Sequence, residues 1–169
     1  ETKYNKKRNV RRCNAKEPVC RYYAPAGTSL ATDATSAHPA TYTCVGYLLE
    51  DGVTNATDTD TSDSNEMGGI KVLSEISGYG ETWQFNMIET NEASLKLRFG
   101  TANVTGTADK LTVYHAIPSG ESLVLVFEIA LTGNRVKRIV VAAGTLTDFD
   151  ATPYIAGDAI GYGVTLSAT

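Results

Sequence analysis

Residues 123–131 (LVLVFEIAL) constrain the fold more than any other part of the sequence. Their odd-numbered positions are all apolar, and Glu128 is the single polar residue at the even-numbered ones. A strand of this kind has to be covered on both faces. Gly133 and Asn134 then give a two-residue turn signal, and residues 135–143 (RVKRIVVAA) can return as an antiparallel partner. The sequence therefore predicts a buried hairpin at the centre of a β-rich domain.

A second hairpin is predicted within residues 68–100. Residues 70–73 form an aliphatic run, residues 77–80 (SGYG) interrupt it, and Trp83, Phe85 and Met87 then alternate with polar residues. The glycines of SGYG are expected at a turn or a bulge. Trp83 shares a face with Phe85 and Met87, so we expect it in the core.

A short helix is predicted after this hairpin. Thr90 or Asn91 can cap its N-terminus, Glu92 and Lys96 are spaced as an i,i+4 ion pair, and Gly100 can end it. The alternation of apolar residues in 93–99 argues for a strand instead. Helix propensity and the caps favour the helix.

The remaining pattern predicts one domain over residues 19–169. An Asp-Gly turn at residues 50–52 is expected to reverse the chain before Val53, and further strands are expected at residues 19–23, 43–49, 102–105, 110–117 and 159–168. Long loops are expected at 24–42, as a surface loop or lying across another subunit, and at 54–69. The fold class is mainly β: an antiparallel β-sandwich or barrel with one short flanking helix.

The predicted loop around residues 54–69 is acidic, since residues 50–69 hold six acids and no base. Asp58, Asp60 and Ser62 have the first spacings of a calcium-binding loop, but Asp63 stands where glycine is needed and Gly69 where glutamate is needed. The EF-hand interpretation therefore fails. A looser Ca²⁺ or Mg²⁺ contact is the alternative to a solvated acidic loop, and we predict no metal or cofactor site.

Charge divides the chain into a basic N-terminal arm and an acidic body. Residues 1–21 hold eight basic and two acidic residues, a net charge of +6, whereas the other 148 residues hold seven basic and 17 acidic ones, a net charge of −10. An arm of this kind contacts nucleic acid, an acidic protein surface, or nothing. Because the body is acidic, we favour a neighbouring copy as its partner. Residues 1–18 are expected to be flexible or inter-subunit.

No catalytic constellation is found, so an enzyme is not expected. His38 and His115 have no nucleophile motif nearby, and the chain lacks a glycine-rich phosphate loop. The three cysteines have no CxxC spacing, and unpaired thiols in a reducing cytosol are the simplest interpretation. No run approaches the roughly 18 apolar residues of a membrane span.

From about Tyr22 to the C-terminus, the sequence resembles the major tail proteins, or tail tube proteins, of long-tailed and particularly non-contractile bacteriophages. The resemblance rests on several segments in the same order: the leader APAGTSLATDATSA, VGYLLEDGVT with the acidic loop, WQFNMIETNEASLKLRFG, the hairpin LVLVFEIALTGNRVKRIVVAAGTLTDF and the closing GDAIGYGVTLSA. Residues 1–18 have no match in this pattern.

The resemblance implies a structural protein of the virion tail, made in the host cytoplasm. Six copies would form a ring whose inner strands join into one β-barrel, and stacked rings would form a tube for genome delivery. A tape-measure protein and a tail terminator are the implied partners, and double-stranded DNA would pass through an acidic lumen without specific binding. Another tube-like protein of the same fold, from a gene transfer agent, a contractile tail or a tail terminator, is a close alternative.

Candidate contact residues follow from this interpretation. Residues 55–69 and the segment before Ala40 are expected to make inter-ring contacts. Arg8, Arg11 and Arg12 are expected to dock on acids of an adjacent subunit. Asp58, Asp60, Asp63 and Glu66 are further candidates for inter-subunit or inter-ring contacts. The alternative from another class is a carbohydrate- or receptor-binding β-sandwich on a virion or cell surface, with Trp83 and the tyrosines as a stacking platform.

Overall fold

The computed structural model describes residues 19–169 apart from residues 31, 35, 108–109, 134 and 156–158. It is mainly β with one short α-helix, as the sequence pattern predicts. The elements in chain order are β1 (Val19–Pro25), β2 (Thr43–Cys44), β3 (Leu48–Asn65), β4 (Lys71–Met87), α1 (Glu92–Phe99), a 3₁₀ turn (Thr101–Asn103), β5 (Val104–Thr107), β6 (Lys110–Val113), β7 (Ser122–Leu131), β8 (Arg135–Phe149) and β9 (Tyr162–Ala168).

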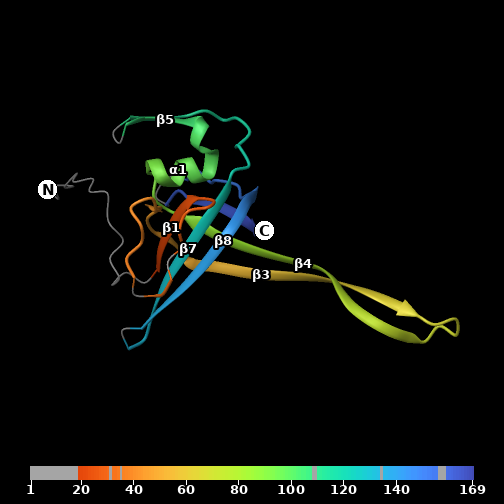
Figure 1. Cartoon of the computed structure of the whole chain (residues 1–169). Coiled ribbons are helices and arrows are strands. Elements are labelled where there is room, and N and C mark those ends of the chain that lie inside the picture. Colours follow the sequence, from red (N-terminus) through yellow and green to blue (C-terminus); the bar gives the residue numbers. More distant parts are fainter. Residues whose placement is uncertain (1–18, 31, 35, 108–109, 134, 156–158) are drawn as a thin grey trace.

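Seven strands form one antiparallel sheet in the order β2-β1-β7-β8-β9-β4-β3, and β5 pairs with β6 in a separate two-stranded sheet. The predicted hairpin of β7 and β8 is confirmed, with Leu131 opposite Arg135, so three residues separate the strands rather than two. The predicted strands at 19–23 and 159–168 correspond to β1 and β9. Figure 1 shows α1 and β5 stacked over one end of the large sheet.

The main core lies between the large sheet and the layer formed by α1, β5 and β6. Trp83, Phe85 and Met87 of β4 point into it, and Trp83 is only 9% exposed. Phe127 of β7 stacks on Trp83 and meets Phe85 edge to edge. Trp83 is therefore a core residue, as its face in β4 predicts, and is not available as a platform for sugar stacking.

Helix α1 begins and ends where the sequence predicts. The Asn91 side chain accepts a hydrogen bond from the Ser94 backbone N–H, and the Ser94 hydroxyl accepts one from the Asn91 N–H, which completes a capping box. Gly100 ends the helix with φ +89, a conformation that favours glycine. Lys96 lies 2.7 Å from Glu92 as the predicted i,i+4 pair.

Over β1, β7 and β8, the second face of the large sheet is covered by the chain itself. The described residues of 26–42 lie there, and Tyr42 packs with Val124 and Val126. The sequence left open whether this segment is a surface loop or lies across another subunit; in the structure its Tyr42 packs on the sheet of its own chain. Tyr42 also donates a hydrogen bond to the Ser29 carbonyl.

An ion-pair network fastens residues 26–42 to the sheet. His38 Nε2 lies 3.0 Å from Glu128 Oε1, and Arg138 donates to the same carboxylate through Nε at 2.8 Å. Arg138 Nη2 also donates to the Ser36 carbonyl at 2.9 Å, and the His38 ring lies 4.1 Å from the Tyr22 ring. His38 thus packs against Tyr22, and Glu128, the single polar residue of the β7 alternation, supplies the negative charge that the buried Arg138 requires.

One cysteine prediction is wrong. Cys44 is disulfide-bonded, whereas the sequence spacing suggested unpaired thiols. Spacing along the chain could not show this, because the bond joins positions that the fold brings together.

Three predicted breaks lie inside long strands. Residues 54–69 are not a loop: β3 continues to Asn65 because it pairs with β4 almost to its end. Residues 77–80 do not end a hairpin, since β4 runs through them and only a bulge occurs there. The Asp-Gly signal at residues 50–52 likewise forms an irregularity between Leu48 and Val53 of a single strand, not a reversal. Pairing with a partner strand overrides these local turn signals.

Candidate functional site

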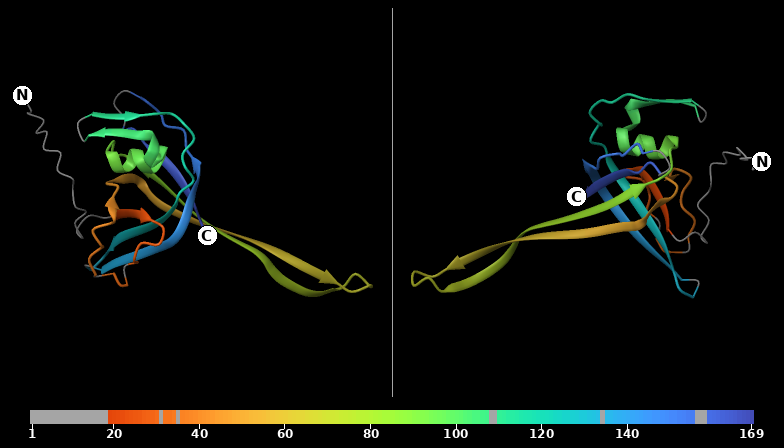
Figure 2. Two further views of the ribbon diagram at one scale, coloured as in Figure 1. Left: turned by 45° about the horizontal axis from the view of Figure 1, so that its top comes forward. Right: turned by 180° about the vertical axis from the view of Figure 1, so that it is seen from behind.

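A two-stranded hairpin projects far beyond the body of the molecule (Figures 1 and 2). β4 pairs with β9 only as far as Glu81, and beyond that point it pairs with β3 alone. We call residues 57–81 the hairpin arm. Nine residues of β3 lie in it, so the arm reaches roughly 30 Å at about 3.3 Å per residue.

The hairpin arm carries its apolar side chains in the open. Those on β4 and at the tip are all strongly exposed: Met67, Ile70, Val72, Leu73, Ile76 and Tyr79. The facing strand β3 supplies only polar or small residues along the arm. A lone two-stranded ribbon is marginal in water, and a run of exposed apolar residues marks an interaction surface.

The two faces of the arm differ in chemistry. Tyr79 pairs with Thr59 and Ile76 with Thr61, on the face that continues from Trp83. On the opposite face Asp58 pairs with Gly80 and Asp60 with Gly78. A Cβ added at Gly78 would approach Asp60 Oδ2 to 3.0 Å, so the Asp60 carboxylate lies over the bare backbone of a glycine.

Among the four predicted contact acids that the structure describes, Asp63 is the one that forms an ion pair. Lys71 Nζ lies 2.8 Å from Asp63 Oδ2, and the Ser74 hydroxyl donates to Asp63 Oδ1 at 2.6 Å. The hydrogen bond from Lys71, followed by that from Ser74, holds the pKa of Asp63 below its usual value. Asp58, Asp60 and Glu66 form no ion pair within the part of the chain that the structure describes.

The arm therefore brings Asp58, Asp60, Asp63 and Glu66 onto one projecting ribbon but on different faces and at its tip. Arg8, Arg11 and Arg12 lie outside the described residues. Sequence reasoning missed the exposed apolar residues of β4. The alternation of small polar residues in β3, with Thr at 57, 59 and 61, is the signal that could have indicated a strand.

The outer edge of β3 is a second open surface. β3 ends the order of the large sheet, and its outer edge has no partner strand among the described residues. At the other end of the sheet, β2 has only two residues. Such edges invite pairing with another chain.

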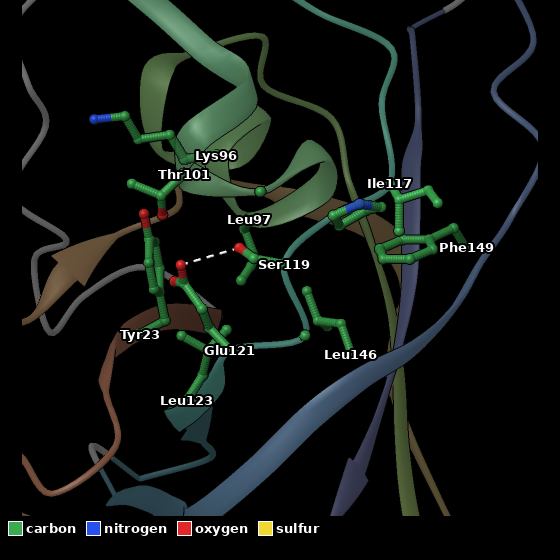
Figure 3. Close-up of a pocket in the computed structure, with 13 residues that line it drawn as sticks. Tyr23, Lys96, Leu97, Thr101, Ile117, Ser119, Glu121, Leu123, Leu146 and Phe149 are labelled. Atoms are coloured by element: carbon green, nitrogen blue, oxygen red, sulfur yellow. Dashed lines mark hydrogen bonds between the residues drawn. The ribbon is translucent and has the colours of Figure 1, made fainter.

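A third feature is a pocket of about 180 Å³ between α1 and the large sheet (Figure 3). Apolar side chains dominate its lining: Leu97, Ile117, Pro118, Leu123, Leu146 and Phe149. Lys96 and Thr101 stand on the helix side, and the Ser119 hydroxyl donates to Glu121 Oε1 at 3.0 Å. Burial, with Glu92 and Glu121 nearby, raises the pKa of Tyr23 in this pocket to about 12.

The described residues contain no group of three or more His, Cys, Asp or Glu side chains that could hold a metal ion. His115 is exposed, and its ring meets the Phe99 ring edge to face. Among the helices of this part of the chain, none has the length and apolar character of a membrane span.

Comparison with known proteins places the chain in a family. Residues 21–169 match the family model described as phage tail tube protein. No curated protein matches the chain. Among solved structures, the chain is similar to one described as the tail of an empty GTA particle with C6 symmetry, at 9% identity and a TM-score of 0.43, with 90% of this chain and 91% of that chain covered.

It is also similar to a chain from the virion of a native gene transfer agent particle, at 10% identity and a TM-score of 0.41, with 78% of this chain and 87% of that chain covered. The family match extends over nearly all of the described residues and fits a β-rich protein with exposed interaction surfaces. This chain belongs to the phage tail tube protein family, a structural family of the virion tail and not a family of enzymes.

Proposed function

We propose that copies of this chain assemble into hexameric rings that stack into the tube of a phage tail, through which the genome is delivered. The observation that carries the proposal is the hairpin arm, with its exposed apolar residues and its projection away from the body. In a monomer, a two-stranded ribbon of this kind is only marginally stable and leaves its apolar side chains exposed to water. Docked on a second copy, the same ribbon buries its apolar side chains.

The geometry favours an open series of contacts over a closed pair. The arm projects from one side of the body, so the surface that receives it on a second copy is a different part of the chain. Contacts of this heterologous kind build rings where the rotation closes and filaments where it does not. The open β3 edge supports the same proposal, since strand pairing between copies would remove it.

The acidic body suits the passage of DNA. The 148 residues after the basic arm carry a net charge of −10, and a negative wall repels phosphates and lets a duplex slide. DNA is therefore expected to pass without specific binding. Membership of the family suggests a tape-measure protein and a tail terminator as partners. We also expect the protein to be synthesised in the host cytoplasm.

The basic residues of the N-terminal segment would bind acidic residues on the hairpin arm of another copy. Asp58 and Asp60 share a face, are exposed, and have no cationic partner within the described residues. Arg8, Arg11 and Arg12 would meet them as opposite charges. Removing residues 1–18 should then impair tube growth and spare the fold. Tubes of normal length from this truncation would contradict the role of the segment.

Negative-stain electron microscopy of the purified protein over a concentration series tests the function itself. Rings or hollow tubes of uniform width are expected as the concentration rises. A monodisperse monomer at high concentration would overturn the proposal. The sugar-binding alternative loses the single tryptophan of its stacking platform, because Trp83 is buried against Phe127.

A further inference from the structure

The tip of the hairpin arm presents one apolar side chain with nothing around it. The Met67 side chain is fully exposed to solvent, and Gly68 and Gly69 follow it. The turn is held by the Gly69 N–H, which donates to the Glu66 carbonyl at 2.9 Å, and by the Glu66 N–H, which donates to the Ile70 carbonyl at 2.9 Å. The turn is therefore ordered by its backbone and presents Met67 as a knob.

The pocket beside α1 has the complementary character. Its volume of about 180 Å³ and its apolar lining suit one aliphatic or thioether side chain. Leu97, Leu123 and Leu146 come from three different elements, so the pocket is built by the tertiary fold and is not a gap in a loop. Ile117 on its edge is 93% exposed, which extends the apolar surface outward.

The arm cannot fill the pocket of its own chain. Figures 1 and 2 show it leaving the body on the side away from α1. Its reach of roughly 30 Å is comparable with the width of a domain of this size, whose radius of gyration is about 15 Å. The tip is thus placed to contact an adjacent copy.

Flanking apolar contacts favour the same partner. The pocket holds Glu121 and a Lys96 that is already paired with Glu92, so Glu66 beside Met67 gains no net charge attraction there. Ile70, the next apolar residue of the turn, would meet the exposed Ile117.

We infer that Met67 of one copy seats in the pocket formed by α1, β7 and β8 of an adjacent copy. This inference rests on the proposed self-assembly and names the residues of one contact in it. One side chain in one pocket buries far less area than the roughly 1,200–2,000 Å² of a typical specific interface. The contact therefore fixes the position of the arm within a larger interface.

Photo-crosslinking tests this contact directly, because the chain has only two methionines. Met87 is fully buried in the core, so photo-methionine incorporated at both positions can reach another copy only through position 67. In assembled protein, the inter-chain product is expected to join residue 67 to residues 96–101, 117–123 or 146–149. A Met67→Leu variant, which conserves volume, should assemble but lose this product.

The outcomes separate this inference from the proposed function. Rings or tubes whose crosslinks from residue 67 map elsewhere, such as to residues 1–18, or are absent, would overturn the pocket contact and leave the assembly intact. Absence of any assembly would overturn both. As a second variant, Met67→Glu should abolish tubes while its thermal unfolding matches the wild type, since the arm tip has no contact with the body; unimpaired tubes would contradict the inference.

Discussion

Trp83 of β4 stacks against Phe127 of β7, with ring centroids 5.6 Å apart and ring planes inclined by 23°. Two strands, β8 and β9, separate β4 from β7 in the sheet. The two rings can meet only because the sheet curls around its core face. This pair therefore joins the base of the hairpin arm to the centre of the sheet and fixes the direction in which the arm leaves the body.

Trp83→Ala should lower the free energy of unfolding by about 3–5 kcal/mol, because it leaves a large cavity against Phe127. Trp83→Phe should cost less, since it keeps most of the ring and removes an indole N–H that is buried without a hydrogen-bond partner. Urea unfolding followed by circular dichroism measures both. Equal costs for the two variants would contradict the packing role.

The carboxylate of Glu128 should contribute strongly to the stability of the fold, because its side chain is only 13% exposed and it pairs with the buried Arg138. Glu128→Gln leaves Arg138, whose side chain is 6% exposed, without its counter-charge and should cost about 3–5 kcal/mol. The double variant Glu128→Leu with Arg138→Met should recover much of that loss, since apolar residues suit the site. A double-mutant cycle by urea unfolding checks this; additive losses would contradict a coupled pair.

Stability should fall at high pH because of Tyr23. Its pKa is raised to about 12 in the folded protein, above the usual value near 10, so the folded state disfavours the phenolate. The stabilising contribution of the neutral phenol is complete below pH 10 and is lost as pH rises through about 12. Ultraviolet titration of wild type minus Tyr23→Phe should show one tyrosine ionising near pH 12; a difference titration near pH 10 would refute the burial.

The carboxylates of Asp58 and Asp60, which share one face of the hairpin arm, should control assembly. Asp58→Asn with Asp60→Asn is expected to raise the concentration needed for tube formation several-fold and to reduce its sensitivity to salt, because the charge partners of the N-terminal segment are removed. Glu50→Gln with Asp51→Asn is the matched control on the same strand outside the arm. Equal effects from the two double variants would mean that net charge matters and the arm does not.

The parts of the fold that sequence predicts well are those whose signals are local. Asn91, Ser94 and Gly100 lie within one helix length, so the caps of α1 could be read directly. The alternation in β7 and its return in β8 are likewise carried by neighbouring residues. The buried position of Trp83 follows from its alternation with Phe85 and Met87.

The hairpin arm could not be predicted because its strand character depends on pairing. Residues 57–65 have no apolar side chain that could mark a buried face, and their aspartates and serines are typical of loops. They become a strand because β4 supplies hydrogen-bonding partners along their whole length. Ser77 and Gly78 form a bulge instead of a turn for the same reason, since Asp60 and Thr61 continue opposite them.

The candidate contact surfaces show the same division. Charge counting located the acids of the arm, yet the pairing alone shows that Asp58 and Asp60 share a face and that Asp63 is occupied by Lys71. The pocket beside α1 collects residues from distant parts of the chain, and no sequence pattern marks it.

Helical reconstruction of assembled protein by cryo-electron microscopy would show where each hairpin arm lies. We expect stacked six-fold rings in which each hairpin arm leaves its own subunit and lies against an adjacent copy, with its β4 apolar side chains buried. A reconstruction in which the arms extend into solvent or fold back on their own subunits would contradict it.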